Sequence, residues 1–264
     1  MKSAEKRQKF QAKLEWLLAV LLSVASVVQM RAQDTSRIVV PARHTWYNYF
    51  GNHALNKRWG LHLEGQWRRD GSGERPMQLL LRPGVNFYLT PNVTLTGGYA
   101  YVRTHRYGEY PVLAGFPEHR FWQQALLRHS PGRRIALQHR YRLEQRKLGE
   151  MRVSPGAAPE RIGWRHENRF RYMFRTDIPL SYRNKQPDWY VAAYDEVLVN
   201  FGRNVAANVF DQNRAYIALG KATGESARVE FGYMNQLLQQ RNGRIFERNH
   251  TLMFSLFSTF RILE

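Results

Sequence analysis

The sequence predicts an all-β fold, a closed antiparallel transmembrane β-barrel, and the stretch Arg161 to Arg175 (RIGWRHENRFRYMFR) is the strongest indication. Side chains of a strand alternate between two faces, whereas a helix would scatter them around its circumference. Here one face is charged and the other aromatic: the first holds Arg165, Glu167, Arg169, Arg171 and Arg175, and the second holds Trp164, Phe170, Tyr172 and Phe174. The stretch is also about three times as long as the usual soluble strand of 5–6 residues. A barrel strand with aromatics toward lipid and arginines toward a polar interior explains both features.

The composition supports this fold class and excludes several others. The chain has 14 Tyr, 14 Phe and 7 Trp, which favours the aromatic girdles of a membrane barrel. A mean hydropathy of −0.56 excludes a multi-helix membrane protein but is compatible with a barrel, in which only alternate residues meet lipid. The absence of cysteine excludes disulfides, thiolate catalysis, Cys-ligated zinc and a lipidated N-terminal cysteine.

Residues 1–32 are predicted to be a secretory signal helix that is cleaved after Ala32. Five Lys or Arg residues precede an apolar run of 13 residues, Trp16 to Val28, which is too short for a spanning helix of about 20 residues. Residues 33–264 then form the barrel. An N-terminal membrane anchor is the alternative.

The net charge of +19, or +15 without residues 1–32, suggests anionic partners. Nucleic acid is disfavoured because the arginines alternate with aromatics and form no basic helix, zinc finger or RNP-like motif. We expect contacts with outer-membrane lipids and the outer-membrane assembly machinery, and with small anionic solutes.

The strands expected before residue 130 continue the alternation. Their ranges are Arg43 to Phe50, Trp59 to Asp70, Met77 to Leu89, Val93 to Arg103 and Glu118 to His129. The second strand has Trp59 and Trp67 on one side and Glu64 and Arg68 on the other. DGSGE and TPN are turns between these strands. For Glu118 to His129 the sequence does not decide which face points inward.

The later strands follow the same rule. Their ranges are Arg134 to Lys147, Arg161 to Arg175, Trp189 to Phe201, Val209 to Lys221, a strand around Val229 to Leu237, and Asn249 to Leu263. The long, small-residue loop Leu148 to Glu160 suits an outer surface, and Asn242-Gly243 indicates a hairpin. Asp195 falls on the outward face, which the alternation does not explain.

These segments give eleven strands, whereas a closed bacterial barrel of this kind needs an even number. We therefore expect twelve strands, with Arg37 to Ala42 as a short additional one, and ten is the alternative.

The chain resembles a family of uncharacterised bacterial outer-membrane β-barrels, domain of unknown function 2490. The resemblance covers roughly Trp46 to the end and is carried by LHLEGQWRRD, LLLRPGVNFYLTPNVTLTGGYAY, HENRFRYMFR, DEVLVNF, FDQNRAYIALG and VEFGYMNQ. It implies a barrel in the outer membrane of a Gram-negative bacterium, with no agreed activity and no catalytic residue. RILE follows Phe260 here, where the family often has an aromatic terminus.

The candidate lumen residues are acidic and basic side chains on the inward faces. They are Glu64, Arg68, Arg82, Arg140, Arg142, Glu144, Arg165, Glu167, Arg169, Arg171, Glu196, Arg214 and Glu230. Arginine and glutamate pair bidentately, so they can fill a narrow lumen as a structural polar core. With unpaired arginines, the same set forms an anion-biased constriction of a narrow, porin-like pore.

The lipid-facing set consists of large apolar and aromatic side chains. Its members are Leu79, Leu81, Trp164, Phe170, Tyr172, Leu252, Phe254 and Leu256. The outward polar residues His139, His166 and Asn168 on adjacent strands allow a second hypothesis, a phospholipase-like enzyme. We do not expect an enzyme, because the outward positions of Ile135 to Leu143 contain no serine nucleophile. No cofactor or metal is expected either, since the nine histidines lack ligand spacing.

Overall fold

The computed structural model describes residues 37–131, 135–183 and 186–262, and the expected signal peptide lies outside this part of the chain. The residues from Ile38 onward form one compact unit. Its strands are β1 (Ile38–Ala54), β2 (Trp59–Asp70), β3 (Arg75–Thr90), β4 (Val93–Thr104), β5 (Phe116–His129), β6 (Ala136–Arg152), β7 (Glu160–Pro179), β8 (Tyr182–Arg183), β9 (Gln186–Pro187), β10 (Trp189–Phe201), β11 (Phe210–Ala222), β12 (Ala227–Gln239) and β13 (Ile245–Ser258). No helix among the described residues is long and apolar enough to cross a membrane.

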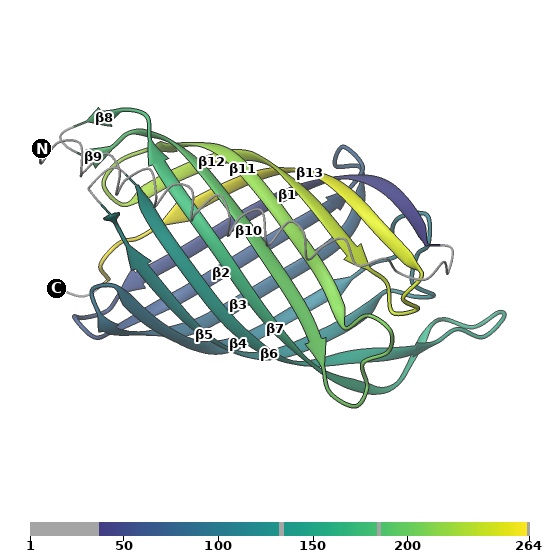
Figure 1. Ribbon diagram of the computed structural model, residues 1–264. Helices are drawn as coiled ribbons and strands as arrows, with labels where there is room; N and C mark the ends of the chain where they lie inside the picture. Colours follow the sequence, from purple (N-terminus) through teal and green to yellow (C-terminus); the bar gives the residue numbers. More distant parts are fainter. Residues whose placement is uncertain (1–36, 132–134, 184–185, 263–264) are drawn as a thin grey trace, which may run out of the picture. The chain divides into compact units, whose positions relative to one another are not determined.

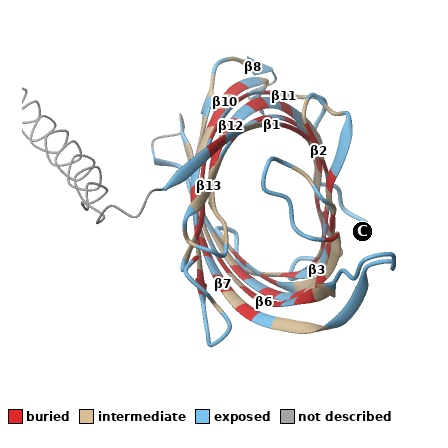
Figure 2. Cartoon of the chain, turned by 90° about the vertical axis from the view of Figure 1, so that its right-hand side faces the viewer, coloured by how far each residue is buried: buried red, intermediate tan, exposed pale blue. Residues whose placement is uncertain are grey.

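Eleven long strands form one closed barrel, in the order β1-β13-β12-β11-β10-β7-β6-β5-β4-β3-β2. Figure 1 shows the strands inclined to the barrel axis, and Figure 2 looks along that axis into the closed ring. Strands β8 and β9 form a separate two-stranded hairpin between β7 and β10. The expected all-β closed barrel is confirmed.

The expected strand number of twelve, or ten, is wrong for the described residues. The closing pair β1 and β13 is parallel, with Ile38 beside Ile245 and Gly51 beside Ser258, so the strand number is odd. Arg37 to Ala42 does not form a strand of its own, because no turn follows Ala42 and β1 runs on from Ile38 to Ala54.

The two faces of each strand differ as the alternation predicts. In β2 and β11 buried and more exposed positions alternate almost without interruption, and the same alternation colours the strands in Figure 2. A cluster of apolar side chains, among them Trp46, Tyr190, Tyr216, Met234 and Met253, is buried inside the barrel.

The connections use the expected turn chemistry. Gly243 has a φ of 73°, a conformation that favours glycine. Beside it, the backbone N–H groups of Arg244 and Ile245 both donate to Asn242 Oδ1 at 3.0 Å. The expected hairpin between β12 and β13 is therefore present.

The structure defines the orientation of β5, which the sequence left open, and explains the outward position of Asp195. In β5 the inward residues are Glu118, Arg120, Trp122 and Gln124, all of them buried. Asp195 of β10 is outward and accepts hydrogen bonds at 3.0 Å from the Asn213 side-chain amide on β11. A neighbouring amide thus partners this exposed carboxylate.

Candidate functional site: the charged lumen

The residues expected in the lumen lie inside the barrel, on strands β2, β3, β6, β7, β10, β11 and β12. The buried ones are Glu64, Arg68, Arg82, Arg142, Glu144, Glu167, Arg169, Arg171, Glu196, Arg214 and Glu230. Arg140 and Arg165 are half-buried, and each lies 2.7 Å from a carboxylate, of Glu196 and Glu167 respectively. Alternation along each strand aims these side chains at one another across the interior.

Glu144 of β6 is the centre of the ion pairs. Its carboxylate has no exposed surface and accepts hydrogen bonds from Arg82 at 3.0 Å and from Arg171 at 3.0 Å. Arg169 donates two more, at 3.0 and 2.5 Å. Strands β3, β6 and β7 are therefore connected through one carboxylate.

Two further carboxylates extend this arrangement to both sides. Glu64 of β2 accepts two hydrogen bonds from Arg82 at 2.8 Å. Glu196 of β10 accepts hydrogen bonds from Arg171 at 2.8 and 2.9 Å and from Arg140 at 2.7 Å. We call this set the central network. It consists of Glu64, Arg82, Arg140, Arg142, Glu144, Arg169, Arg171, Glu196 and Arg214. Paired in this way, the buried charges satisfy the requirement that a buried ion has partners.

Sequence reasoning missed several members of the lumen. Glu118 of β5 accepts hydrogen bonds from Arg120 at 2.7 Å and Arg146 at 2.5 Å. Asp211 accepts one from Arg169 at 2.9 Å. A bulge opposite Leu198 and Val199 turns both Asp211 and Gln212 inward, which simple alternation does not anticipate.

Glu230 lies outside the central network. It pairs with Arg175 and accepts hydrogen bonds from the hydroxyl groups of Tyr190 at 2.9 Å and Tyr216 at 3.2 Å. Arg165 and Glu167 pair with each other, and Glu167 also lies 3.6 Å from Arg146, which is connected through Glu118 and Arg120 to Glu144. The lumen therefore contains the central network, which this chain of ion pairs extends, and a second charge cluster around Glu230.

Trp122 forms an apolar wall of the central network. The indole is fully buried and lies over Gly84, where an added Cβ would come within 2.8 Å of its ring. The guanidinium of Arg142 lies 4.9 Å from the ring centre and that of Arg82 lies 5.7 Å from it. Burial beside an aromatic face favours cation–π attraction.

In the described part of the barrel, three buried arginines, Arg68, Arg142 and Arg214, have no carboxylate as close as those of the other buried lumen arginines. Arg142 and Arg214 are 3.7 and 3.6 Å from the nearest carboxylates of Glu64 and Glu196, and both donate closer hydrogen bonds to glutamine side chains. Among the described residues, Arg68 forms no ion pair. Its guanidinium donates to Gln66 and to Gln78, the latter at 2.6 Å, and lies 3.9 Å from the centre of the Trp46 ring.

The set expected to face outward is mostly exposed. Leu79, Leu81, Phe170, Leu252, Phe254 and Leu256 are exposed, whereas Tyr172 and Trp164 are partly covered. The ring of Trp164 packs against Arg161 and His119. Exposed apolar side chains thus surround the barrel.

The outward polar residues of the enzyme hypothesis do not come together. His139 lies opposite Phe174, whereas His166 lies opposite Lys147, far along β6. At about 3.3 Å per residue the two histidines are roughly 26 Å apart along the strands. His139 Nδ1 is instead 2.9 Å from the hydroxyl of Tyr172. No group of three His, Asp or Glu side chains in the described part could hold a metal ion.

Comparison with known proteins gives a family but no activity. No curated protein matches the chain. A solved structure titled as the NanC porin in a rhombohedral crystal form is similar, with a TM-score of 0.43 and 10% identity over 76% of this chain and 90% of that chain. The family described as protein of unknown function (DUF2490) matches residues 43–247, so the chain belongs to that family.

Proposed function

We propose that this protein is an outer-membrane β-barrel of a Gram-negative bacterium that passes small anions through a narrow lumen. The membrane location is supported by the exposed apolar side chains on the outer wall, such as Leu81 and Phe254. Closure of the sheet supports it too, because a closed barrel leaves no unpaired strand edge in hydrocarbon.

The observation that carries the anion preference is the hydrogen bonding of Arg68, Arg142 and Arg214. Their shortest hydrogen bonds go to neutral glutamine oxygens, and Arg68 has no carboxylate within ion-pair distance in the described part of the chain. Their positive charge is thus compensated less than that of Arg171 or Arg169. Fixed charges lining a constriction select ions of the opposite sign.

The strand number supports a small conductance. An eight-stranded barrel is just filled by its side chains, whereas barrels of 16–18 strands leave an aqueous channel. Eleven strands lie between these limits, and the ion pairs around Glu144 fill part of the interior. The ion pairs therefore supply a structural polar core, and the less compensated arginines supply the selectivity of the remaining path.

We propose no enzymatic role, and the separation of His139 from His166 supports that choice. The test is the reversal potential of the refolded protein in planar bilayers under a potassium chloride gradient. We expect small, anion-selective conductance. Cation selectivity, or an absence of conductance in a folded and inserted barrel, would overturn the proposal.

A further inference from the structure

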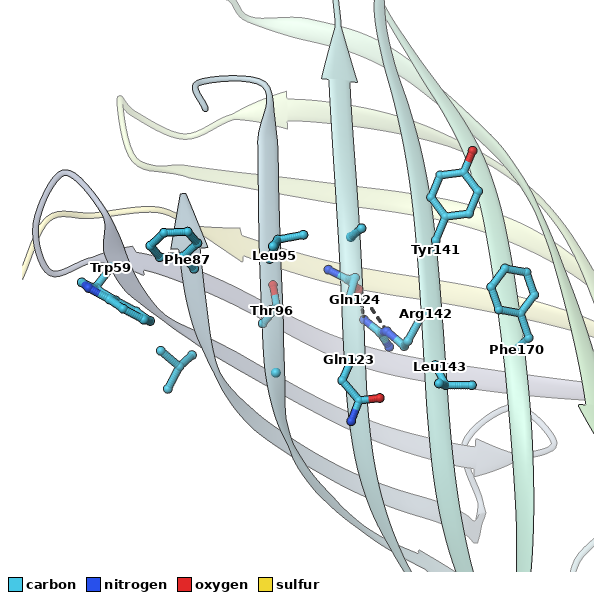
Figure 3. A pocket seen from close by; sticks show the side chains of 13 residues that line it. Trp59, Phe87, Leu95, Thr96, Gln123, Gln124, Tyr141, Arg142, Leu143 and Phe170 are labelled. Carbon is cyan, nitrogen blue, oxygen red and sulfur yellow. Dashed lines mark hydrogen bonds between the residues drawn. The ribbon is translucent and has the colours of Figure 1, made fainter. Parts of the chain in front are cut away.

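An open groove of about 610 Å³ crosses the outer wall of the barrel. Figure 3 shows Trp59 and Phe87 at one end and Tyr141 and Phe170 at the other. Between these two pairs of rings the outer surface is recessed, because the outward side chains there are small: β4 contributes Gly97 and β5 contributes Ala125. An added Cβ at Gly97 would meet nothing within 4 Å.

The groove follows one row of paired residues from β2 to β7. Trp59 pairs with Phe87, Phe87 with Leu95, Leu95 with Ala125 and Ala125 with Tyr141. On β7 the groove is lined by Phe170, two positions from the Tyr172 that pairs with Tyr141. Five strand spacings of about 4.8 Å make this row about 24 Å long. It begins at the first residue of β2 and ends beside the middle of β7.

The rise of the row along the membrane normal matches the thickness of one lipid leaflet. Strands of membrane barrels tilt by 35–45°, so a row perpendicular to them climbs by about 15 Å along the membrane normal. The hydrocarbon core is about 30 Å thick, of which one leaflet is about half. The groove thus starts at one end of the barrel wall, where Trp59 is placed as interfacial aromatics are, and reaches about the middle of the membrane.

Positive charge stands at the end where the groove begins. Lys57 and Arg58 directly precede Trp59, are exposed, and form no ion pair within the described residues. The backbone N–H groups of Arg58 and Trp59 donate to Asn56 Oδ1 at 2.8 and 2.9 Å, which fixes this turn. Consecutive Cα atoms are about 3.8 Å apart, so a group bound by Arg58 lies at the mouth of the groove.

We propose that the groove binds an anionic phospholipid, with the phosphate at Lys57 and Arg58 and one acyl chain along the row from Trp59 to Tyr141. This proposal rests on the membrane location proposed above. The charge of the two cations complements the headgroup, and the apolar wall complements the chain. Four lining residues are polar. Thr96, Gln124 and Arg142 are buried, and Arg142 donates to Gln124, while the amide of Gln123 exchanges hydrogen bonds with Gln145 at 3.2 and 3.3 Å.

The test is native mass spectrometry of the refolded barrel in detergent, with dioleoylphosphatidylglycerol and dioleoylphosphatidylcholine as probes. We expect preferential retention of phosphatidylglycerol. Gly97→Leu fills the groove and should reduce retention roughly tenfold, which corresponds to about 1.4 kcal/mol. Gly65→Leu is the matched control, because Gly65 also has nothing within 4 Å of an added Cβ but lies outside the groove.

A second pair of measurements separates headgroup from chain. Lys57→Gln with Arg58→Gln should abolish the preference for phosphatidylglycerol while retention of phosphatidylcholine persists. Ala125→Leu fills the same groove from β5 and replaces Gly97→Leu if that variant does not fold, as judged by heat-modifiable migration on gels. Equal retention by the filled variants and Gly65→Leu would overturn the proposal, as would an absence of headgroup preference in the unmutated protein. Lipid retention is measured without reference to conductance. The lipid-binding proposal and the pore proposal can therefore be refuted independently of each other.

Discussion

Arg68 stacks on Trp46, with 3.9 Å between its guanidinium carbon and the ring centre, and it has no carboxylate within ion-pair distance in the described part of the barrel. Arg171, by contrast, donates to both Glu144 and Glu196. The two arginines are buried to a similar degree but differ in partners. They should therefore respond differently to the same substitution.

Arg68→Gln should lower the free energy of unfolding by about 2 kcal/mol, the size of a desolvated cation–π contact. Arg171→Gln should lower it by about 3–5 kcal/mol, because it leaves buried carboxylates with fewer partners. Urea-induced unfolding in lipid vesicles, followed by tryptophan fluorescence, compares the two. A larger loss for Arg68→Gln would show that the partners are assigned wrongly.

Glu144→Gln tests the centre of the network. It leaves Arg82, Arg169 and Arg171 with less compensation, so we expect a loss of about 3–5 kcal/mol in the same unfolding measurement. The control is Glu160→Gln, which breaks the exposed pair between Glu160 and Arg152 and should cost less than about 1 kcal/mol. Similar losses for both variants would contradict the role assigned to Glu144.

Gly98→Ala tests the close approach of β3 and β4. An added Cβ would come within 2.3 Å of the Pro83 carbonyl oxygen and 2.6 Å of Gly84 Cα, so the two backbones must separate. We expect a loss of about 1–3 kcal/mol, as for other overpacked sites. Gly97→Ala, one residue earlier and on the other face, has open space and should fold normally in the same unfolding measurement. Equal stability of the two variants would refute this packing.

Leu81→Arg tests whether the outer wall meets hydrocarbon. An arginine at the bilayer midplane of a barrel wall costs about 2–4 kcal/mol, so Leu81→Arg should reduce the yield of folded, heat-modifiable protein. Val153→Arg adds the same charge at an exposed position in the connection between β6 and β7 and should fold like the unmutated protein. If both variants fold equally well, the position of Leu81 within the membrane is wrong.

The sequence was sufficient to predict the barrel fold and the inward face of most strands, because the alternation of side chains along a strand is a local property. In β7 arginines alternate with aromatics, so the two faces could be told apart. In β5 both faces carry polar residues, His119 and Gln123 outward against Glu118 and Gln124 inward, and no phase could be chosen.

The direction of the closing strand pair and the odd strand number could not be predicted, because they depend on contacts between strands at the two ends of the chain. Nothing in β1 or β13 indicates that they pair in parallel, and the even-number rule led to twelve strands. The bulge that turns Asp211 inward depends on its register with β10. The choice of Glu144 as the common partner of Arg82 and Arg171 likewise follows from the curvature of the closed sheet.

The ion selectivity of a double variant, Arg68→Gln with Arg214→Gln, tests the anion-selective lumen most directly. Neither arginine has a carboxylate closer than 3.6 Å among the described residues, so the ion pairs of Glu144 and Glu196 with Arg171 should persist. We expect the unmutated protein to be anion-selective in planar bilayers and the double variant to lose most of that selectivity while remaining folded. Unchanged anion selectivity in a folded double variant would contradict the assignment of these arginines as the selective charges.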